Sequence, residues 1–250
     1  MPDGLYVYCI IGTGEARNFN LKGIGDRGDT VTTIAYGELS AVVSSVPMSN
    51  YVISREVMLC HEEVLEKVMQ DYTILPERFY TVAPNAEEIR RLLRTRYTEF
   101  KTLLRELDNK VEVSLKAYWK DMNRVMLALL KHGPSAQRSA AAGQARLVTG
   151  IAQAERGSLT ALEERPAQMR ELLLKSLKPL AVDVRLNNSY GENMILNASV
   201  FVDRSREKDL DTLVERLSAQ YAESVAFQYV GPIPPYSFVN IVIKGEAFGD

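Results

Sequence analysis

The stretch VEVSLKAYW, residues 111–119, is predicted to form a β-strand, and it opens the part of the chain whose element order decides the fold. From Val111 onward the sequence patterns predict strand, helix, strand, strand, helix and strand. This is the element order of the split βαβ unit in ferredoxin-like folds. We therefore expect an α+β fold with a ferredoxin-like C-terminal domain.

The elements after this strand are predicted from composition and periodicity. Residues 135–177 are rich in Ala, Glu, Arg, Leu and Gln and carry no strand pattern, so a long helical segment with a break near Pro166 is expected. A hairpin around NSYGE joins LAVDVRLN (180–187) to NMILNASVFVD (193–203). A helix with one apolar stripe follows, formed by Leu210, Leu213, Val214, Leu217 and Tyr221. The last predicted strands are SVAFQYV (224–230) and SFVNIVIK (237–244).

The long helical segment is expected to pack against the C-terminal sheet. The apolar side chains assigned to this contact are Leu159, Leu162, Met169, Leu172 and Leu173. Leu173 is therefore predicted to be a buried side chain.

The first hundred residues also mix strands and helices. In LYVYCII (5–11), the odd-numbered and the even-numbered residues, which would point to opposite faces of a strand, are both largely apolar. This predicts a strand covered on both faces. Further predicted elements are a hairpin of TVTTIAY (30–36) and ELSAVVSSV (38–46), a helix over 54–72, a strand TILPERFYTV (73–82) and one periodic helix from 85 to 107. Ser54 and Asn85 have the chemistry of N-caps. We expect two domains, residues 1–109 and 110–250.

Composition and charge limit the function classes. The chain has 250 residues, 30 basic and 32 acidic, and its formal net charge of -2 argues against a nucleic-acid binder held by phosphate neutralisation. Its two cysteines, Cys9 and Cys60, are too few for a disulfide framework, so reduced thiols are expected. No window approaches the run of about 18 apolar residues that predicts a membrane span. We expect a soluble cytoplasmic protein without a nucleic-acid or lipid-membrane partner.

Two short motifs have the form of cofactor or metal sites, but their context argues against both. GIGDRG (23–28) matches a dinucleotide-binding pattern, yet a strand-like run follows where that pattern needs a helix. His61 lacks the second histidine four residues later that a zinc motif needs, and Cys60 points about 100° away from it around a helix. His61 lies on the apolar stripe of its helix, so a packed, hydrogen-bonded histidine is expected. We expect no catalytic residue, no cofactor and no metal site.

The C-terminal stretch YVGPIPPYSFVNIVIK, residues 229–244, places a glycine and three prolines between two strand-forming runs. Gly231 allows a change of direction. The prolines cannot donate ladder hydrogen bonds, so GPIPP is expected to be a stiff extended spacer before a strand resumes at Ser237. Two interpretations stay open, a buried crossover at a sheet edge and a docking surface for another protein. The candidate interaction residues are Tyr229, Pro232, Ile233, Pro234, Pro235, Tyr236 and Phe238.

Several stretches together resemble the gas vesicle GvpF/GvpL family. YVGPIPPYSFVNI contains the Gly-Pro-x-Pro-Pro-Tyr-x-Phe run that is typical of that family's C-terminal region. LYVYCII resembles its opening strand, GELSAVVS its first hairpin, HEEVLEKVM its His-led helix and VEVSLKAYW the strand that opens its second half. ILPERFYTV resembles a run that more often reads Leu-Pro-x-Arg-Phe-Gly-Thr, with Tyr80 in place of the glycine. The resemblance spans nearly the whole chain.

This resemblance implies a minor structural or assembly component of gas vesicles, the hollow protein shells that give aquatic microbes buoyancy. It implies contact with the small, hydrophobic major shell protein in the cytoplasm, and it allows contact with other gas vesicle accessory proteins. No enzymatic activity is expected. The alternative is a small-molecule-binding regulatory module, because ferredoxin-like sheets often carry ligands.

Overall fold

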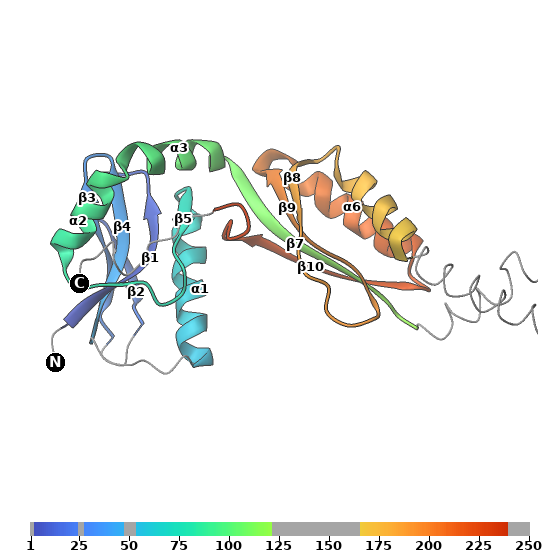
Figure 1. Ribbon diagram of the computed structural model, residues 1–250, viewed down its shortest axis with the longest axis horizontal. Coiled ribbons are helices and arrows are strands. Elements are labelled where there is room, and N and C mark those ends of the chain that lie inside the picture. Colours follow the sequence, from blue (N-terminus) through green and yellow to red (C-terminus); the bar gives the residue numbers. More distant parts are fainter. Residues whose placement is uncertain (1–2, 25–27, 48–53, 122–165, 240–250) are drawn as a thin grey trace, which may run out of the picture. The chain divides into compact units, whose positions relative to one another are not determined.

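The computed structural model describes residues 3–24, 28–47, 54–121 and 166–239 (Figure 1). Strands and helices are mixed along the chain, and the strands form two antiparallel sheets. The chain divides into two compact units, Met1–Glu112 together with Pro232–Asp250, and Val113–Gly231. Within the described residues, none of the helices combines the length and the apolar character needed to cross a lipid membrane.

The first sheet is built around β1 and has the strand order β2-β3-β4-β1-β5, with β6 also paired to β1. Its strands are β1 (Asp3–Ile11), β2 (Asn18–Lys22), β3 (Thr30–Tyr36), β4 (Leu39–Pro47), β5 (Ile74–Pro76) and β6 (Val82–Ala83). Every residue of β1 from Tyr6 to Ile11 is buried, because this central strand has a strand on each side and is covered on both faces. The burial predicted for LYVYCII is confirmed.

The predicted hairpin and first helix are also confirmed. β3 and β4 pair antiparallel up to Tyr36 opposite Leu39, across a turn in which Gly37 has a φ of 60°. Helix α1 (Arg55–Met69) begins after Ser54, whose side chain accepts a hydrogen bond from the Val57 backbone N–H. The buried side chains of α1 are His61, Val64, Leu65 and Val68, and they belong to or adjoin the core around β1.

The periodic run after Asn85 forms two helices rather than the single predicted helix. They are α2 (Ala86–Thr95) and α3 (Tyr97–Leu107). Arg96 lies between them with φ -106° and ψ 21°, which is outside the helical region. Its guanidinium binds the Glu99 carboxylate and lies 4.9 Å from the centre of the Phe100 ring. Both helices keep an apolar stripe, so periodicity alone does not reveal the break.

The stretch TILPERFYTV forms two short strands, β5 and β6, instead of one. Residues between them leave the ladder because Pro76 has no backbone N–H and Tyr80 has a φ of 74°. The loop still follows β1, since Glu77 N donates to the Tyr8 carbonyl (2.9 Å) and Val7 N donates to the Thr81 carbonyl (2.8 Å).

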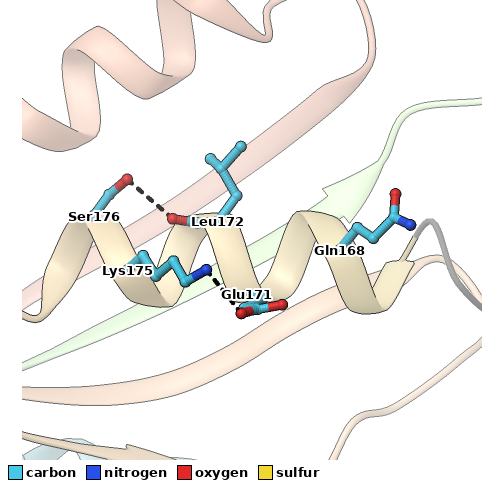
Figure 2. Close-up of a pocket in the computed structure, with 5 residues that line it drawn as sticks. All are labelled: Gln168, Glu171, Leu172, Lys175 and Ser176. Carbon is cyan, nitrogen blue, oxygen red and sulfur yellow. Dashed lines mark hydrogen bonds and ion pairs between the residues drawn. The ribbon is translucent and has the colours of Figure 1, made fainter.

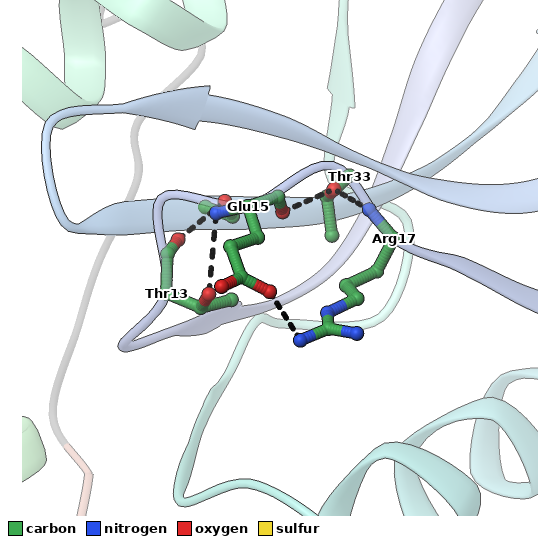
Figure 3. Close-up of polar contacts among 5 residues, drawn as sticks. Thr13, Glu15, Arg17 and Thr33 are labelled. Atoms are coloured by element: carbon green, nitrogen blue, oxygen red, sulfur yellow. Dashed lines mark hydrogen bonds and ion pairs between the residues drawn. The ribbon is translucent and has the colours of Figure 1, made fainter.

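The polar edge strand β2 was not predicted, because NFNLK is short and lies at an exposed edge. The loop before β2 is held to β3 by hydrogen bonds around Thr33 (Figure 3). Arg17 N donates to Thr33 Oγ1 (2.8 Å), and Thr33 Oγ1 donates to the Glu15 carbonyl (3.2 Å). The Arg17 and Glu15 side chains also form an exposed ion pair.

The second sheet has the strand order β10-β7-β9-β8. Its strands are β7 (Lys110–Trp119), β8 (Ala181–Leu186), β9 (Met194–Asp203) and β10 (Val225–Ile233). A short 3₁₀ turn, η1 (Arg204–Arg206), precedes α6 (Glu207–Gln220), which lies between β9 and β10 in the chain. The antiparallel hairpin of β8 and β9 and the buried stripe Leu210, Leu213, Val214 and Leu217 of α6 confirm the predictions for these elements. Tyr221, the fifth predicted stripe residue, is the C-cap of α6 and is only half-buried.

The described part of the long helical segment is a helix over residues 166–177. Leu173 is fully buried, and Arg170 Nε donates to the Ile195 carbonyl of β9 (2.8 Å), which joins this helix to the sheet. Leu172 was expected to pack as well, but it is 40% exposed because it lies about 100° from Leu173 around the helix. Leu159 and Leu162 lie outside the described residues, as does the chain before Pro166, where a break was expected.

Candidate protein-interaction site

The sequence around Gly231 does not interrupt the strand as expected. β10 continues through Gly231 and Pro232 and ends at Ile233. Gly231 serves a close approach between strands, because a Cβ there would lie 2.9 Å from Cγ2 of Val113 on β7. The change of direction therefore comes after Ile233.

The chain turns at the second and third prolines, and Ser237 does not restart a strand. The Pro235 carbonyl accepts hydrogen bonds from the backbone N–H groups of Phe238 (3.1 Å) and Val239 (3.0 Å). Pro234 and Pro235 have no N–H with which to continue the ladder. The backbone therefore forms a turn, whose N–H groups donate to the Pro235 carbonyl. Residues 240–244 of the predicted strand lie outside the described residues.

Glu112 fixes this turn to the first unit. Its carboxylate accepts two hydrogen bonds from Ser237, one from the backbone N (2.8 Å) and one from Oγ (2.6 Å). Glu112 is almost fully buried, as are Pro234 and Pro235. A buried carboxylate needs such charge-assisted hydrogen bonds to offset its lost hydration, so the turn and Glu112 depend on each other.

Tyr236 lies at the surface of the same turn. Its hydroxyl donates to Glu62 Oε1 on α1 (3.0 Å), while the residue stays 38% exposed. Partial burial, and then the negative charge of Glu62, raise the pKa of Tyr236 well above its ordinary value. Burial likewise raises the pKa of Glu62. The hydroxyl is thus held in place and the ring keeps an accessible part.

Tyr229 is assigned to a different compact unit from the other candidate residues. It lies on β10 in the second unit, whereas the candidates from Pro232 to Phe238 belong to the first unit. The Tyr229 hydroxyl donates to Asp211 Oδ1 of α6 (2.6 Å), and the side chain is half-buried. This contact links a helix and a strand within the second unit.

A buried aromatic cluster adjoins Glu62 and Tyr236. The Tyr6 hydroxyl shares a hydrogen bond with His61 Nδ1 (2.9 Å) and accepts another from Tyr80 N (3.0 Å). The His61 ring stacks on Tyr8 with centroids 5.7 Å apart and meets the edge of Phe79 at 5.5 Å. His61 is a packed, hydrogen-bonded histidine, as predicted.

Burial sets the charge state of this cluster. It lowers the pKa of His61 to about 4 and raises the pKa of Tyr8 to about 12, so both side chains are neutral near pH 7. The Tyr8 hydroxyl is also bound by Ser44 Oγ (2.8 Å) and by Ile24 N (2.7 Å). The cluster is a neutral, hydrogen-bonded core beside the accessible Tyr236.

Glu77 is a second buried carboxyl group of the first unit. It is 1% exposed, and among the described residues no group forms a hydrogen bond with its Oε1. Burial raises the pKa of Glu77 to about 8, and the positive charges of Arg96 and Arg78 offset only part of that effect. Glu77 is therefore mostly protonated near pH 7.

The described residues also form a surface groove, but they bring no cluster of metal-ligating side chains together. Across the described ranges, no three or more His, Cys, Asp or Glu side chains gather closely enough to hold a metal ion. A groove of about 370 Å³ is lined by Gln168, Glu171, Leu172, Lys175 and Ser176 (Figure 2). All of these side chains come from one helix, so the groove is a depression of its surface and not an enclosed ligand cavity.

Stretches that are far apart in the sequence meet at this site. Tyr6 comes from LYVYCII, His61 from HEEVLEKVM, Phe79 from ILPERFYTV and Tyr236 from YVGPIPPYSFVNI. These are the stretches that resemble the gas vesicle family. The family model for "Gas vesicle synthesis protein GvpL/GvpF" matches residues 4–240. The chain belongs to the GvpL/GvpF family.

Relatives in this family match along almost their whole length. Gas vesicle protein F of Streptomyces sp. (strain CB03234) is 31% identical over 94% of this chain and 99% of that protein. The crystal structure of GvpF from Microcystis aeruginosa has 26% identity and a TM-score of 0.78, covering 95% of this chain and 99% of that chain. That of GvpF from Anabaena sp. PCC7120 has a TM-score of 0.81 at 24% identity, covering 96% and 100%, and shows a shared fold.

Tyr80 has an unfavourable backbone conformation in the loop between β5 and β6. With a φ of 74°, Tyr80 occupies a region that is strained for a residue with a Cβ and is favourable for glycine. We expect Tyr80→Gly to be more stable than Tyr80→Ala by about 1 kcal/mol in chemical denaturation, because both variants lack the ring and only alanine keeps the strained Cβ. Equal stability of the two variants would show that the loop relaxes without strain.

Proposed function

We propose that this GvpL/GvpF family member is a minor structural and assembly component of gas vesicles, and that it binds the major shell protein and so supports vesicle formation and buoyancy. It acts in the cytoplasm at the vesicle, without enzymatic activity, cofactor, nucleic acid or lipid membrane. Other gas vesicle accessory proteins are a second partner class. Family membership supports the gas vesicle role, and the site described above supports the binding role.

The observation that carries the binding proposal is a pre-ordered turn with an accessible aromatic ring. Two hydrogen bonds from Ser237 to Glu112 and the buried Pro234 and Pro235 hold the turn before any partner arrives. A pre-ordered segment loses less conformational entropy on binding than a mobile loop. The Tyr236 residue remains 38% exposed, and tyrosine is frequent among residues that dominate binding energy.

Helix α1 extends the accessible apolar surface in the same unit. Glu62, which binds the Tyr236 hydroxyl, lies on this helix one turn after Met58. Met58 and its neighbour Leu59 are each at least half exposed. We propose that Tyr236, Met58 and Leu59 contact the shell protein, which is itself hydrophobic. Ile233, the prolines and the half-buried Phe238 shape the segment. Tyr229 stays a candidate contact of the second unit, taken by itself.

A ferredoxin-like second unit is part of the proposal. The sheet order β10-β7-β9-β8 supports it, because the first and third strands of the unit lie at the centre and the second and fourth at the edges. The domain bounds 1–109 and 110–250, with the proline-rich C-terminal strand in the second domain, stay a prediction.

A pull-down between the purified full-length chain and the major gas vesicle shell protein tests the proposed function. We expect the chain to retain the shell protein through washes at moderate salt, because an apolar contact depends little on ionic strength. An unrelated α+β protein of similar size is the control. Recovery of the shell protein at the level of that control would overturn the binding role.

A further inference from the structure

The two edge strands of the second sheet differ in how well they exclude another strand. β10 forms one edge and contains Pro232, which has no N–H to donate and therefore blocks strand addition. β8 forms the other edge and contains neither proline nor glycine. Within the residues that the structure describes, β8 pairs with β9 alone.

The β8 edge also exposes apolar side chains. Val182 is 56% exposed and Leu186 is 55% exposed. An exposed apolar edge strand is a template for pairing with another chain unless its charges prevent that pairing. The charged residues of β8 are Asp183 and Arg185, and both are exposed. A strand that pairs with this edge must therefore place complementary charges opposite them.

The sequence Val182-Asp183-Val184-Arg185-Leu186 is complementary to itself in the antiparallel direction. A twofold axis at Val184 would place Asp183 opposite Arg185 of a second copy, and Val182 opposite its Leu186. Opposite charges and apolar pairs directly across a ladder are stabilising. Parallel pairing in register, or an axis moved by one residue, would place like charges opposite each other. The pattern therefore favours one partner and one register.

The Asp183 side chain binds polar groups of its two neighbours on β8 when no second strand is present. Asp183 Oδ1 accepts a hydrogen bond from Val184 N (2.8 Å), and Asp183 Oδ2 lies 3.6 Å from Arg185 Nε. A second copy would exchange these contacts for equivalent ones across the axis, and the gain would come from covering Val182 and Leu186. The register shift between Ala181 and Asp183 lies at Val182, so Val182 forms the irregular end of the new ladder.

We propose that β8 is a self-association edge, at which two copies of this chain pair antiparallel through residues 182–186 about a twofold axis at Val184. The pairing is reversible and weak, because the shared strand is short. It joins two copies through the second unit and does not depend on the proposed contact with the shell protein.

Sedimentation equilibrium of the full-length chain up to about 0.5 mM tests the pairing, because small interfaces associate in this range. We expect a monomer–dimer equilibrium that Asp183→Arg weakens at least tenfold, since arginines then face each other at both charge positions. The double variant Asp183→Arg with Arg185→Asp should restore dimerisation. Glu215→Arg, the same charge change on the exposed side of α6, is the control and should leave the dimer intact. A monomeric wild type, or a dimer that Asp183→Arg leaves unchanged, would overturn the proposal.

Disulfide trapping tests the register. In a Cys60→Ser background, Val184→Cys should form covalent dimers under mild oxidation, because facing residues of an antiparallel pair have Cα atoms about 4.5–5.5 Å apart, within disulfide reach. Val182→Cys is the matched control. Its two copies would lie about 13 Å apart along the ladder, too far to bridge. Efficient trapping at position 182, or none at position 184, would contradict the twofold axis at Val184.

Discussion

Leu173→Ala is expected to lower the free energy of unfolding of the second unit by about 2–5 kcal/mol. The side chain is fully buried on the helix over residues 166–177. The bond from Arg170 to the Ile195 carbonyl holds this helix to β9, so the helix cannot close around the cavity that alanine would leave. Urea denaturation followed by Trp119 fluorescence measures the effect, because Trp119 is the single tryptophan of the chain and belongs to the second unit.

Leu172→Ala is the matched control for this measurement. It removes the same atoms from the adjacent residue of the same helix, which is 40% exposed. We expect it to cost less than about 1 kcal/mol, since little apolar surface returns to water. Similar small losses for both variants would mean that Leu173 does not anchor the helix.

The first unit of the wild type is expected to lose stability as the pH rises toward 8. Glu77→Gln is expected to abolish this loss. The carboxyl has a pKa of about 8 in the folded chain and ionises near 4.5 when the chain is unfolded. The folded state therefore holds the proton more tightly, and this stabilisation is complete below about pH 4.5 and is lost as the pH rises through about 8. Between pH 6.5 and 8 we expect the wild type to lose about 1.5 kcal/mol and the glutamine variant to lose none of it.

The pH range isolates Glu77 from His61. The pKa of His61 is lowered from 6.5 to about 4, so its stabilisation is complete above pH 6.5 and is lost as the pH falls through about 4. Urea denaturation at pH 6.5 and 8, followed by the near-UV circular dichroism of the buried tyrosines, measures the first unit. Glu87→Gln changes an exposed carboxyl and is the control. If the wild type and Glu77→Gln lose stability equally over this range, Glu77 is ionised in the folded chain.

Local patterns were sufficient to predict many of the elements. Ser54 and Asn85 mark the beginnings of α1 and α2 because their side chains accept hydrogen bonds from the first turns. The two-sided apolar alternation of β1 predicts its burial on both faces, and Gly37 marks the hairpin between β3 and β4. These features depend on neighbours a few residues apart, which a sequence displays directly.

Features that depend on distant neighbours were missed. The break at Arg96 leaves the apolar period of the two helices unchanged, and β2 has too little apolar character to be recognised. Glu112 has the pattern of a solvated residue on an alternating strand, yet it is buried because Ser237 meets it from the far end of the sequence. Nothing near Glu77 in the sequence indicates that the loop after β5 buries its carboxyl.

The candidate interaction site was predicted in part. The proline-rich stretch was recognised by its missing backbone donors, but its turn and its acceptors Glu62 and Glu112 were not, because both contacts span more than a hundred residues. The aromatic cluster of Tyr6, His61 and Phe79 was likewise visible only as separate family motifs. Its assembly depends on the sheet that brings these motifs together.

We propose that the proline-rich turn docks a partner and does not merely complete the first unit. Paired measurements of Tyr236→Ala, its affinity for the major shell protein and its melting temperature, test this most directly. We expect the affinity to fall about tenfold or more while the melting temperature changes little, because Tyr236 is partly exposed at the surface. Tyr236→Phe keeps the ring and loses the bond to Glu62, so it should bind nearly as the wild type does. Unchanged affinity of Tyr236→Ala together with a large drop in its melting temperature would contradict docking and leave the turn a purely architectural element.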